Sequence, residues 1–267
     1  MTISTRLAFK SLLRRFEADC VCDIGACDGS ESLVFRQILP EAALVAFEAN
    51  PYLFQKLAND SRFPTNRIGI YPYAIASSNG TAPFRVPDLD YVKADNKNPE
   101  IGTGSLLVFE GMKVKETVQV STRRIDEFVL SHYPEARRIG LWIDAEGAEF
   151  EIIEGMTGIK DRVVALHVET HFLPRFPSQK LYSDVERSLK SMGFVPVCTN
   201  TAKDGLWGDV VFAAEGKLAD LGWRYQFCKW AACLIGWCRI DSVGLFLKKH
   251  CYPLYRPLFR LYVRLFT

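Results

Sequence analysis

Hydrophobic residues in this chain form short runs that alternate between strand-like and helix-like spacing. Apolar-rich runs at 21–24, 43–47 and 141–143 predict buried strands. After two of these runs, at 33–39 and 150–153, apolar residues recur at the spacing of one helix face. This alternation of strands and helices predicts a doubly wound, mostly parallel α/β sheet.

The middle and the end of the chain carry further patterns. Residues 68–76 predict a third strand, and Asn79-Gly80 predicts the turn of a hairpin into 81–86. Residues 87–105 have no apolar period, and a loop of that length is often a lid or a substrate-binding segment. The remaining predicted elements are strands at 118–120, 163–171, 195–198 and 209–213 and helices at 124–130 and 181–192.

Composition and charge narrow the class of protein. The chain has 267 residues, of which 48% are hydrophobic, enough for one large α/β domain. Its net charge of +2 conceals a split, because residues 216–267 carry +7 and residues 1–215 carry −5. The acidic part has no run of lysine and arginine of the kind that marks a nucleic-acid groove. We therefore expect no nucleic-acid substrate.

Acidic residues follow the predicted strand 141–143 in the stretch WIDAEGAEFEIIEGM. Ligands of open α/β sheets bind at the carboxyl ends of the strands, so Asp144 and Glu146 are candidates for a reacting site. The alternative is a charge cluster at a helix start, because Glu146 and Glu149 would interact favourably with the helix dipole. The pattern alone leaves both interpretations open.

The segment ADCVCDIGACDGSESLVFRQILP predicts a strand, a glycine loop and a helix that Ser30 caps. Asp23, Gly25 and Gly29 fall in the intervening loop, where the missing side chains of the glycines let a ligand approach the backbone. Cys27 and Ser30 stand where the dinucleotide fingerprint needs glycine, so a nicotinamide dehydrogenase is disfavoured.

Glu48 ends the next predicted strand, 43–47. An acid at this position can accept hydrogen bonds from both ribose hydroxyls of an adenosine group. The alternative is a solvated glutamate before a helix. Beside the glycine loop, we favour the ribose-binding interpretation.

Six segments in this order resemble the FkbM-type family of class I S-adenosylmethionine-dependent methyltransferases. They are VCDIGACDGSESLVF, AFEANP, YAIASSNGTAPFRV, STRRIDEF, WIDAEGAEFEIIEGM and ALHVET, within about residues 18–213. The D-x-E-G-x-E core is the most specific of these marks, whereas the glycine loop is shared by all class I methyltransferases. The resemblance implies a seven-stranded, mostly parallel Rossmann-like sheet and methyl transfer from S-adenosylmethionine, usually to an oxygen.

The resemblance also implies roles for single residues. Those that correspond to the cofactor loop are Asp23, Gly25, Ala26 and Gly29. Glu48 corresponds to the ribose acid, Ala74 to a neighbour of the adenine, and Asp144 to the acid beside the methyl group. The departures are Cys27 inside the loop and Trp142, where the family more often has lysine.

The predicted strand 163–171 brings further candidates to the sheet end that carries Asp144. His167 and Glu169 are two positions apart, so they leave one face of the strand together and could form a base with its orienting carboxylate. His171 is the alternative base, and a histidine held by core hydrogen bonds is the alternative to both. The candidate catalytic residues are therefore Asp144, Glu146, His167 and Glu169.

A metal-dependent alternative uses Asp144, Glu146 and Glu169 as oxygen ligands of magnesium. We favour the metal-free interpretation, because sequence spacing alone demonstrates no ligand geometry. Ser105, at the end of the long loop, is a further candidate for contact with cofactor or substrate, and a structural role is the alternative.

Three expectations concern the two ends of the chain and its compartment. Cys20, Cys22 and Cys27 crowd one strand and its loop, where disulfide geometry is poor, so we expect reduced thiols and a cytoplasmic protein. We divide the chain into an amphipathic helix, the methyltransferase domain and a basic, aromatic helical tail, at 1–17, 18–215 and 216–267. The tail suits either peripheral contact with the inner membrane face or dimerisation.

The sequence thus predicts an S-adenosylmethionine-dependent O-methyltransferase. Its expected acceptor is a hydroxyl of a sugar or another secondary metabolite, and the basic tail suits a lipid-linked form. The competing hypothesis is a non-catalytic α/β subunit that binds a nucleotide or cofactor and serves as an assembly partner.

Overall fold

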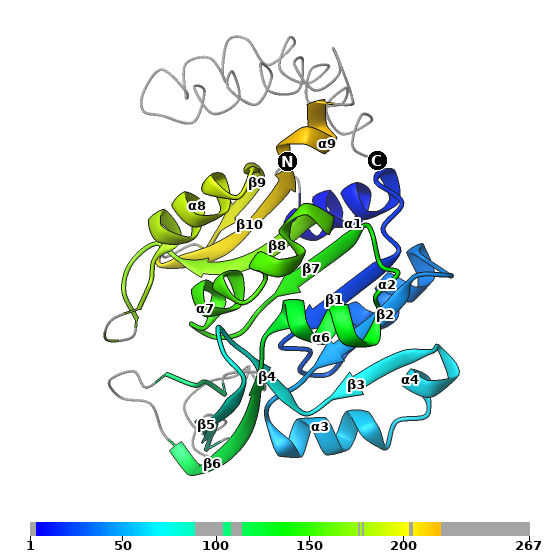
Figure 1. The fold of residues 1–267 in the computed structure, drawn as a ribbon. Helices are drawn as coiled ribbons and strands as arrows, with labels where there is room; N and C mark the ends of the chain where they lie inside the picture. The colour runs from blue at the N-terminus through cyan, green and yellow to red at the C-terminus, as the bar shows by residue number, and fades with distance from the viewer. Residues whose placement is uncertain are drawn as a thin grey trace, which may run out of the picture.

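A seven-stranded sheet forms the centre of the molecule, with strand order β3-β2-β1-β7-β8-β10-β9 (Figure 1). The computed structural model of the protein describes residues 4–88, 104–107, 114–175, 177, 179–202 and 205–219. The strands are β1 (Cys20–Ile24), β2 (Ala43–Phe47), β3 (Ile68–Tyr71), β7 (Ile139–Ile143), β8 (Val163–His171), β9 (Phe194–Thr201) and β10 (Trp207–Ala214). Every pair is parallel except the two made by β10. The expected seven-stranded, mostly parallel sheet is confirmed.

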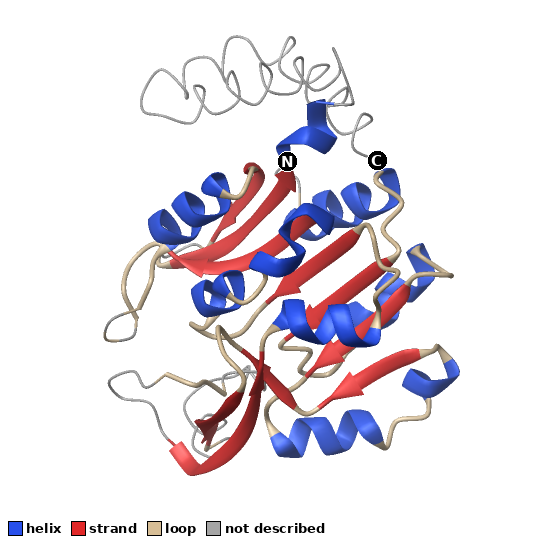
Figure 2. Cartoon of the chain, viewed as in Figure 1, coloured by secondary structure: helices blue, strands red, loops and turns tan. Residues whose placement is uncertain are grey.

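Helices cover both faces of this sheet (Figure 2). They are α1 (Thr5–Arg15), α2 (Ser30–Ile38), α3 (Pro51–Ala58), α4 (Arg62–Thr65), α6 (Ile125–His132), α7 (Glu149–Glu154), the 3-10 helix η1 (Thr157–Arg162), α8 (Tyr182–Ser191) and α9 (Glu215–Ala219). Side chains alternate along each strand, so the core has two halves. In β1, Cys20 and Cys22 pack with α6, α7 and α8, whereas Val21 packs with α1 and α2.

Helix α1 belongs to the same core as the sheet. Phe9, Leu12 and Leu13 are buried on the face that α1 turns toward the strands. The Phe9 ring packs edge-on against Trp142 of β7, with centroids 5.7 Å apart. The N-terminal segment is therefore an amphipathic helix, as its spacing predicts, and it covers the sheet.

A second, three-stranded sheet lies beside the carboxyl ends of the central strands. Its strands are β4 (Tyr73–Ile75), β5 (Gly80–Pro87) and β6 (Val114–Arg123), in the order β4-β6-β5. The expectation of one strand over 68–76 is wrong, because β3 pairs in the central sheet and β4 pairs with β6. The chain thus leaves the central sheet after β3 and forms a separate small sheet.

The predicted hairpin at Asn79-Gly80 is also wrong, because β6 lies between the two strands that the turn connects. The Asn79 side chain accepts a hydrogen bond from the Arg124 N–H at 2.8 Å and donates one to Glu127 at 2.6 Å. The turn is therefore tied to α6 and does not close a two-stranded ribbon.

None of the described helices is both long and apolar enough to cross a membrane. Of the tail at 216–267, the structure describes only the residues that belong to α9. The expected contact of the tail with a membrane or with a second copy lies outside the described residues and stays a prediction.

Candidate functional site

A pocket with a cavity volume of about 250 Å³ opens at the carboxyl ends of the central strands. The loops after β1, β2 and β7 form one part of its wall, and the small sheet contributes β4 and Phe84. The ends of β8 and β10 complete the wall with Glu169 and Trp207. Ligands of open α/β sheets bind at this edge, which makes the pocket the candidate active site.

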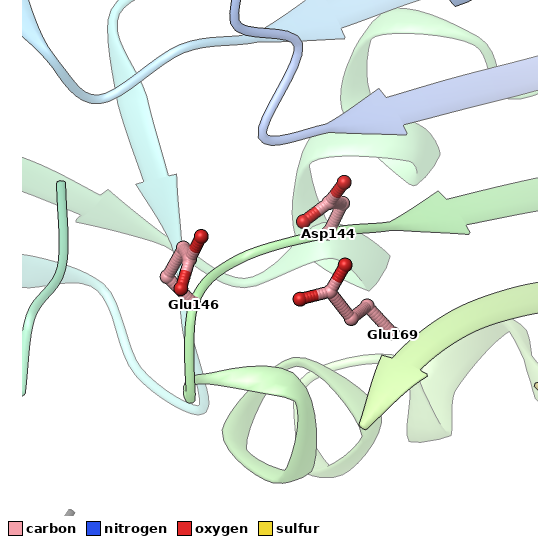
Figure 3. A group of neighbouring side chains, drawn as sticks. All are labelled: Asp144, Glu146 and Glu169. Carbon is pink, nitrogen blue, oxygen red and sulfur yellow. The ribbon is translucent and has the colours of Figure 1, made fainter. Parts of the chain in front are cut away.

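Three carboxyl groups meet on the wall of this pocket (Figure 3). Asp144 directly follows β7, Glu146 lies in the next turn, and Glu169 lies near the end of β8. One oxygen atom from each group lies within 4.8 Å of the other two. β7 and β8 are parallel neighbours, and this pairing brings acids from two separate segments into one cluster.

Burial and mutual repulsion determine the protonation of this acid cluster. Burial, followed by the charges of Asp144, Glu146 and Glu149, raises the pKa of Glu169 to about 10. This rise favours the protonated form of Glu169, which can donate a hydrogen bond. Arg175 Nη1 lies 3.5 Å from Glu146 Oε2 and offsets part of the negative charge. The cluster thus combines a hydrogen-bond donor with acidic oxygens that can accept.

Glu48 lines the same pocket directly after β2. Its two carboxylate oxygens accept backbone hydrogen bonds from Cys27 at 2.7 Å and from Asn50 at 2.8 Å. Burial raises the pKa of Glu48 to about 7, and these two hydrogen bonds oppose the rise. A carboxylate oxygen can accept more than one hydrogen bond, so this rigid side chain retains lone pairs for the hydroxyl groups of a ligand.

Gly25 joins the loop after β1 to the loop after β7. Its φ is +85°, and a Cβ atom at this position would lie 1.8 Å from the carbonyl oxygen of Asp144. The Asp144 N–H also donates a hydrogen bond to Ile24 at 2.9 Å. The two loops are therefore in direct backbone contact, and no residue with a side chain fits at Gly25.

The wall of the pocket suits a ligand that is polar in one part and flat and apolar in another. Glu48 can hold hydroxyl groups, and Phe47, Ala74 and Ile75 offer an apolar surface nearby. The oxygens of the acid cluster are also of the type that binds magnesium. A shared proton or a divalent cation could each offset the charge of the cluster.

The family model of the methyltransferase FkbM domain matches residues 23–196, which span both the glycine loop and the acid cluster. The chain belongs to the FkbM methyltransferase family. The resemblance noted in the sequence is thereby confirmed.

One curated relative in the comparisons is the 2-O-methyltransferase NoeI of Sinorhizobium fredii. The two sequences are 28% identical over 142 residues, which cover 51% of this chain and 56% of NoeI. The chain thus spans about half the length of the curated relative that it matches.

Similar solved structures include two methyltransferases. The precorrin-6y C5,15-methyltransferase of Geobacter metallireducens is 15% identical, with a TM-score of 0.42 over 78% of this chain and 86% of that one. The magnesium protoporphyrin IX methyltransferase of Synechocystis PCC 6803 is 12% identical, with a TM-score of 0.38 over 72% of this chain and 68% of that one.

The residues that correspond to the FkbM cofactor loop take two different places. Gly25 lines the pocket, whereas Asp23, Ala26 and Gly29 do not. Asp23 is 2% exposed and accepts a hydrogen bond from Ser32 Oγ at 2.5 Å. Gly29, and not Ser30, is the N-cap residue of α2. These three residues lie behind the pocket lining, and their direct contact with a ligand stays a prediction.

Neither His167 nor His171, the two histidines predicted as bases, lines the pocket. His167 stacks on Trp142 with ring centroids 3.6 Å apart and lies against Phe9 of α1. Burial lowers the pKa of His167 to about 3 and that of His171 to about 4. A strand rises about 3.3 Å per residue, so His167 lies roughly 6.6 Å further from the sheet edge than Glu169.

The two remaining candidates from the sequence differ in their placement. Ala74 lines the pocket, where the FkbM family would have a neighbour of the adenine. Ser105 does not line the pocket, and its Oγ donates a hydrogen bond to the carbonyl oxygen of Glu146 at 2.7 Å. Ser105 therefore contacts the turn that carries the acids, and direct contact with a ligand is not its role here.

Sequence reasoning missed Arg175 and Trp207, among other pocket residues, and the place of Glu149. Arg175 follows β8 and Trp207 begins β10, and no motif marks either of them. Glu149 stands in the D-x-E-G-x-E motif, yet its Oε1 is 2.8 Å from the Gly147 N–H and holds the turn. The motif and the charge pattern at the helix start were the signals for Glu149, and neither distinguishes a structural role from a catalytic one.

Proposed function

We propose that the protein transfers a methyl group from S-adenosylmethionine to a hydroxyl oxygen of a sugar or another secondary metabolite. The observation that carries this proposal is the acid cluster of Asp144, Glu146 and Glu169 in the pocket that Glu48 also lines. Membership of the FkbM family supports methyl transfer. The relative NoeI is a 2-O-methyltransferase, which supports an oxygen acceptor.

The pocket residues fit the parts of this cofactor. We assign Glu48 to the ribose hydroxyls and the surface of Phe47 and Ala74 to the adenine. Gly25 lines the pocket, and we assign the methionine part to the space beside this loop. When bound, S-adenosylmethionine supplies a sulfonium whose methyl group is electrophilic. The acids of the cluster favour a positive charge beside them.

The acid cluster handles the proton of the acceptor. An alcohol must lose its proton during or just after its oxygen attacks the methyl group. We assign Asp144 as the proton acceptor, because it directly follows β7 and contacts the Gly25 loop through its backbone. Glu169, whose protonated form is favoured by burial, supplies the hydrogen bond that orients the reacting oxygen or Asp144.

Two variants separate cofactor binding from chemistry. Glu48→Ala should weaken S-adenosylmethionine binding at least tenfold, because each hydrogen bond to a charged acceptor contributes about 1.5–3 kcal/mol. Asp144→Asn should lower turnover by about 10²–10⁴, a larger loss than its effect on cofactor affinity. Calorimetry gives the affinity, and S-adenosylhomocysteine formation with a panel of methyl hexopyranosides gives turnover. Glu41→Ala, at an exposed acid, is the control.

The same measurements decide between the alternatives. Unchanged affinity in Glu48→Ala would remove this residue from the cofactor site. Turnover that EDTA abolishes and magnesium restores would replace the metal-free assignment by a metal-dependent one. Tight cofactor binding without turnover of any acceptor would favour the non-catalytic subunit.

A further inference from the structure

We propose that Ser105 and Glu149 clamp the peptide group between Glu146 and Gly147, and that this clamp positions the Glu146 carboxylate in the acid cluster. The inference rests on the proposed function and deepens it. Neither Ser105 nor Glu149 lines the pocket, so both act through Glu146 as positioning residues.

Buried side chains hold both ends of this one peptide group. At its carbonyl end, Ser105 Oγ donates a hydrogen bond to Glu146 O at 2.7 Å. At its amide end, the Gly147 N–H donates a hydrogen bond to Glu149 Oε1 at 2.8 Å. Ser105 is 1% exposed and Glu149 is 4% exposed, so water does not compete for either bond. The two bonds together determine the orientation of the peptide plane.

The turn needs such a clamp because its backbone conformation is unusual. Glu146 has a φ of +48° and Gly147 has a φ of +104°. A residue with a side chain rarely occupies the left-handed region unless its surroundings hold it there. From this turn the Glu146 carboxylate lies beside Asp144 and Glu169 (Figure 3). The clamp supplies contacts that keep Glu146 in the conformation that completes the cluster.

Ser105 is in turn fixed to the small sheet. Arg85 and Ser105 exchange two backbone hydrogen bonds of 2.9 and 3.3 Å. The Leu107 N–H donates a third hydrogen bond to Ser105 Oγ at 2.9 Å. Phe84 and Leu106, the sequence neighbours of the bridged pair, line the pocket. The clamp therefore couples the pocket wall formed by the small sheet to the turn that carries Glu146.

Ser105→Ala tests the clamp by removing one donor with little change in volume. With a methyl hexopyranoside as acceptor, kcat/KM should fall at least about tenfold, because small misplacements of a reacting group are costly. Affinity for S-adenosylmethionine and Tm should change little. Ser131→Ala is the matched control, because it removes a serine-to-carbonyl hydrogen bond to Phe128 outside the pocket lining. Loss of cofactor affinity equal to the loss of turnover would overturn the proposal.

A double-mutant cycle tests whether Ser105 acts through Glu146. In a Glu146→Asn background, the effect of Ser105→Ala on kcat/KM should shrink to less than about twofold, because residues in one network are not additive. Asparagine tolerates the left-handed conformation but has no carboxylate. Equal effects of Ser105→Ala in both backgrounds would overturn the proposal.

Glu149 has a conservative variant that separates positioning from proton transfer. Glu149→Gln keeps an oxygen that accepts the Gly147 N–H, so turnover should stay within about threefold of the parent. Glu149→Ala should match Ser105→Ala. Loss of turnover in Glu149→Gln with unchanged Tm would assign proton chemistry to Glu149 and overturn its positioning role.

Hydrogen exchange at the Gly147 amide reports on the clamp without any acceptor. In Ser105→Ala this amide should exchange at least about tenfold faster than in the parent chain, because one end of its peptide group is released. Unchanged exchange would overturn the clamp. If the parent chain methylates no acceptor, the proposed function fails, and faster Gly147 exchange in Ser105→Ala would still support the clamp.

Discussion

His167 illustrates how the position of a residue along a strand decides its chemistry. Among the described residues, no hydrogen-bond partner lies within reach of either ring nitrogen of His167. The ring is 2% exposed and is stacked on Trp142. A neutral imidazole at this position packs in the core and does not exchange protons with a ligand in the pocket.

The lowered pKa of His167 makes stability depend on pH. The folded value of about 3 lies below the ordinary value of 6.5, so on acidification the unfolded chain binds the proton first. The stability contribution is complete above pH 6.5 and is lost as the pH falls toward 3. His167→Phe removes the titrating group. The difference in free energy of unfolding between the variant and the parent should therefore be about 2 kcal/mol more in favour of the variant at pH 5 than at pH 8.

Urea denaturation at the two pH values measures this difference, with His132→Phe at the surface as the control. A constant difference between His167→Phe and the parent at both pH values would contradict the proposed burial effect. Loss of turnover in His167→Phe would return this histidine to the catalytic candidates.

The sequence predicts the position of some site residues better than that of others. Asp144 and Glu48 directly follow strands, so strand period and the rule for open sheets are enough to bring them to the pocket edge. His167 and Asp23 lie inside strands, one or more pleats from that edge. Whether such a side chain reaches the ligand depends on strand ends and register, which no local pattern encodes.

At the scale of elements, local signals predict strands but not their partners. The turn signal of Asn79-Gly80 is genuine, yet β4 and β5 both pair with β6, which begins more than twenty residues after β5 ends. β4 and β5 pair with the two edges of the long strand β6 and not with each other, and only the tertiary structure shows this pairing. Most strands of the central sheet were predictable from their apolar runs, whereas the pattern did not separate β3 from β4.

Helix α1 should contribute measurably to the stability of the sheet. Phe9→Ala should lower the free energy of unfolding by about 3–5 kcal/mol, because it removes a fully buried ring that contacts Phe35 and Trp142. Leu7→Ala, on the exposed side of α1, should stay within about 0.5 kcal/mol of the parent. Urea denaturation compares the two variants, and equal losses would show that α1 is not anchored through Phe9.

For the whole molecule, the uneven distribution of charge along the chain suggests a second role, contact with an anionic surface. Residues 216–267 carry +7, and Arg256, Arg260 and Arg264 recur every four positions. Each basic residue near an anionic surface contributes roughly 1 kcal/mol. The full chain should therefore sediment with anionic liposomes at low salt and be released by high salt.

Combined Arg256→Glu, Arg260→Glu and Arg264→Glu should abolish this sedimentation without changing Tm. A parent chain that stays in the supernatant at low salt would refute the membrane hypothesis. A concentration-dependent dimer that disappears when the tail is deleted would instead show that the aromatic residues of the tail pack against protein.

The pairing of β1 with β7 joins residues that are far apart in the chain, since Ile24 lies opposite Ile143. Pocket walls that come from β1, β2, β8 and β10 depend on such non-local contacts, which form slowly. During synthesis, the glycine loop emerges long before the acids that it contacts. A small molecule that contacts all of these walls therefore stabilises the finished fold more than precursors in which β8 and β10 have not yet paired.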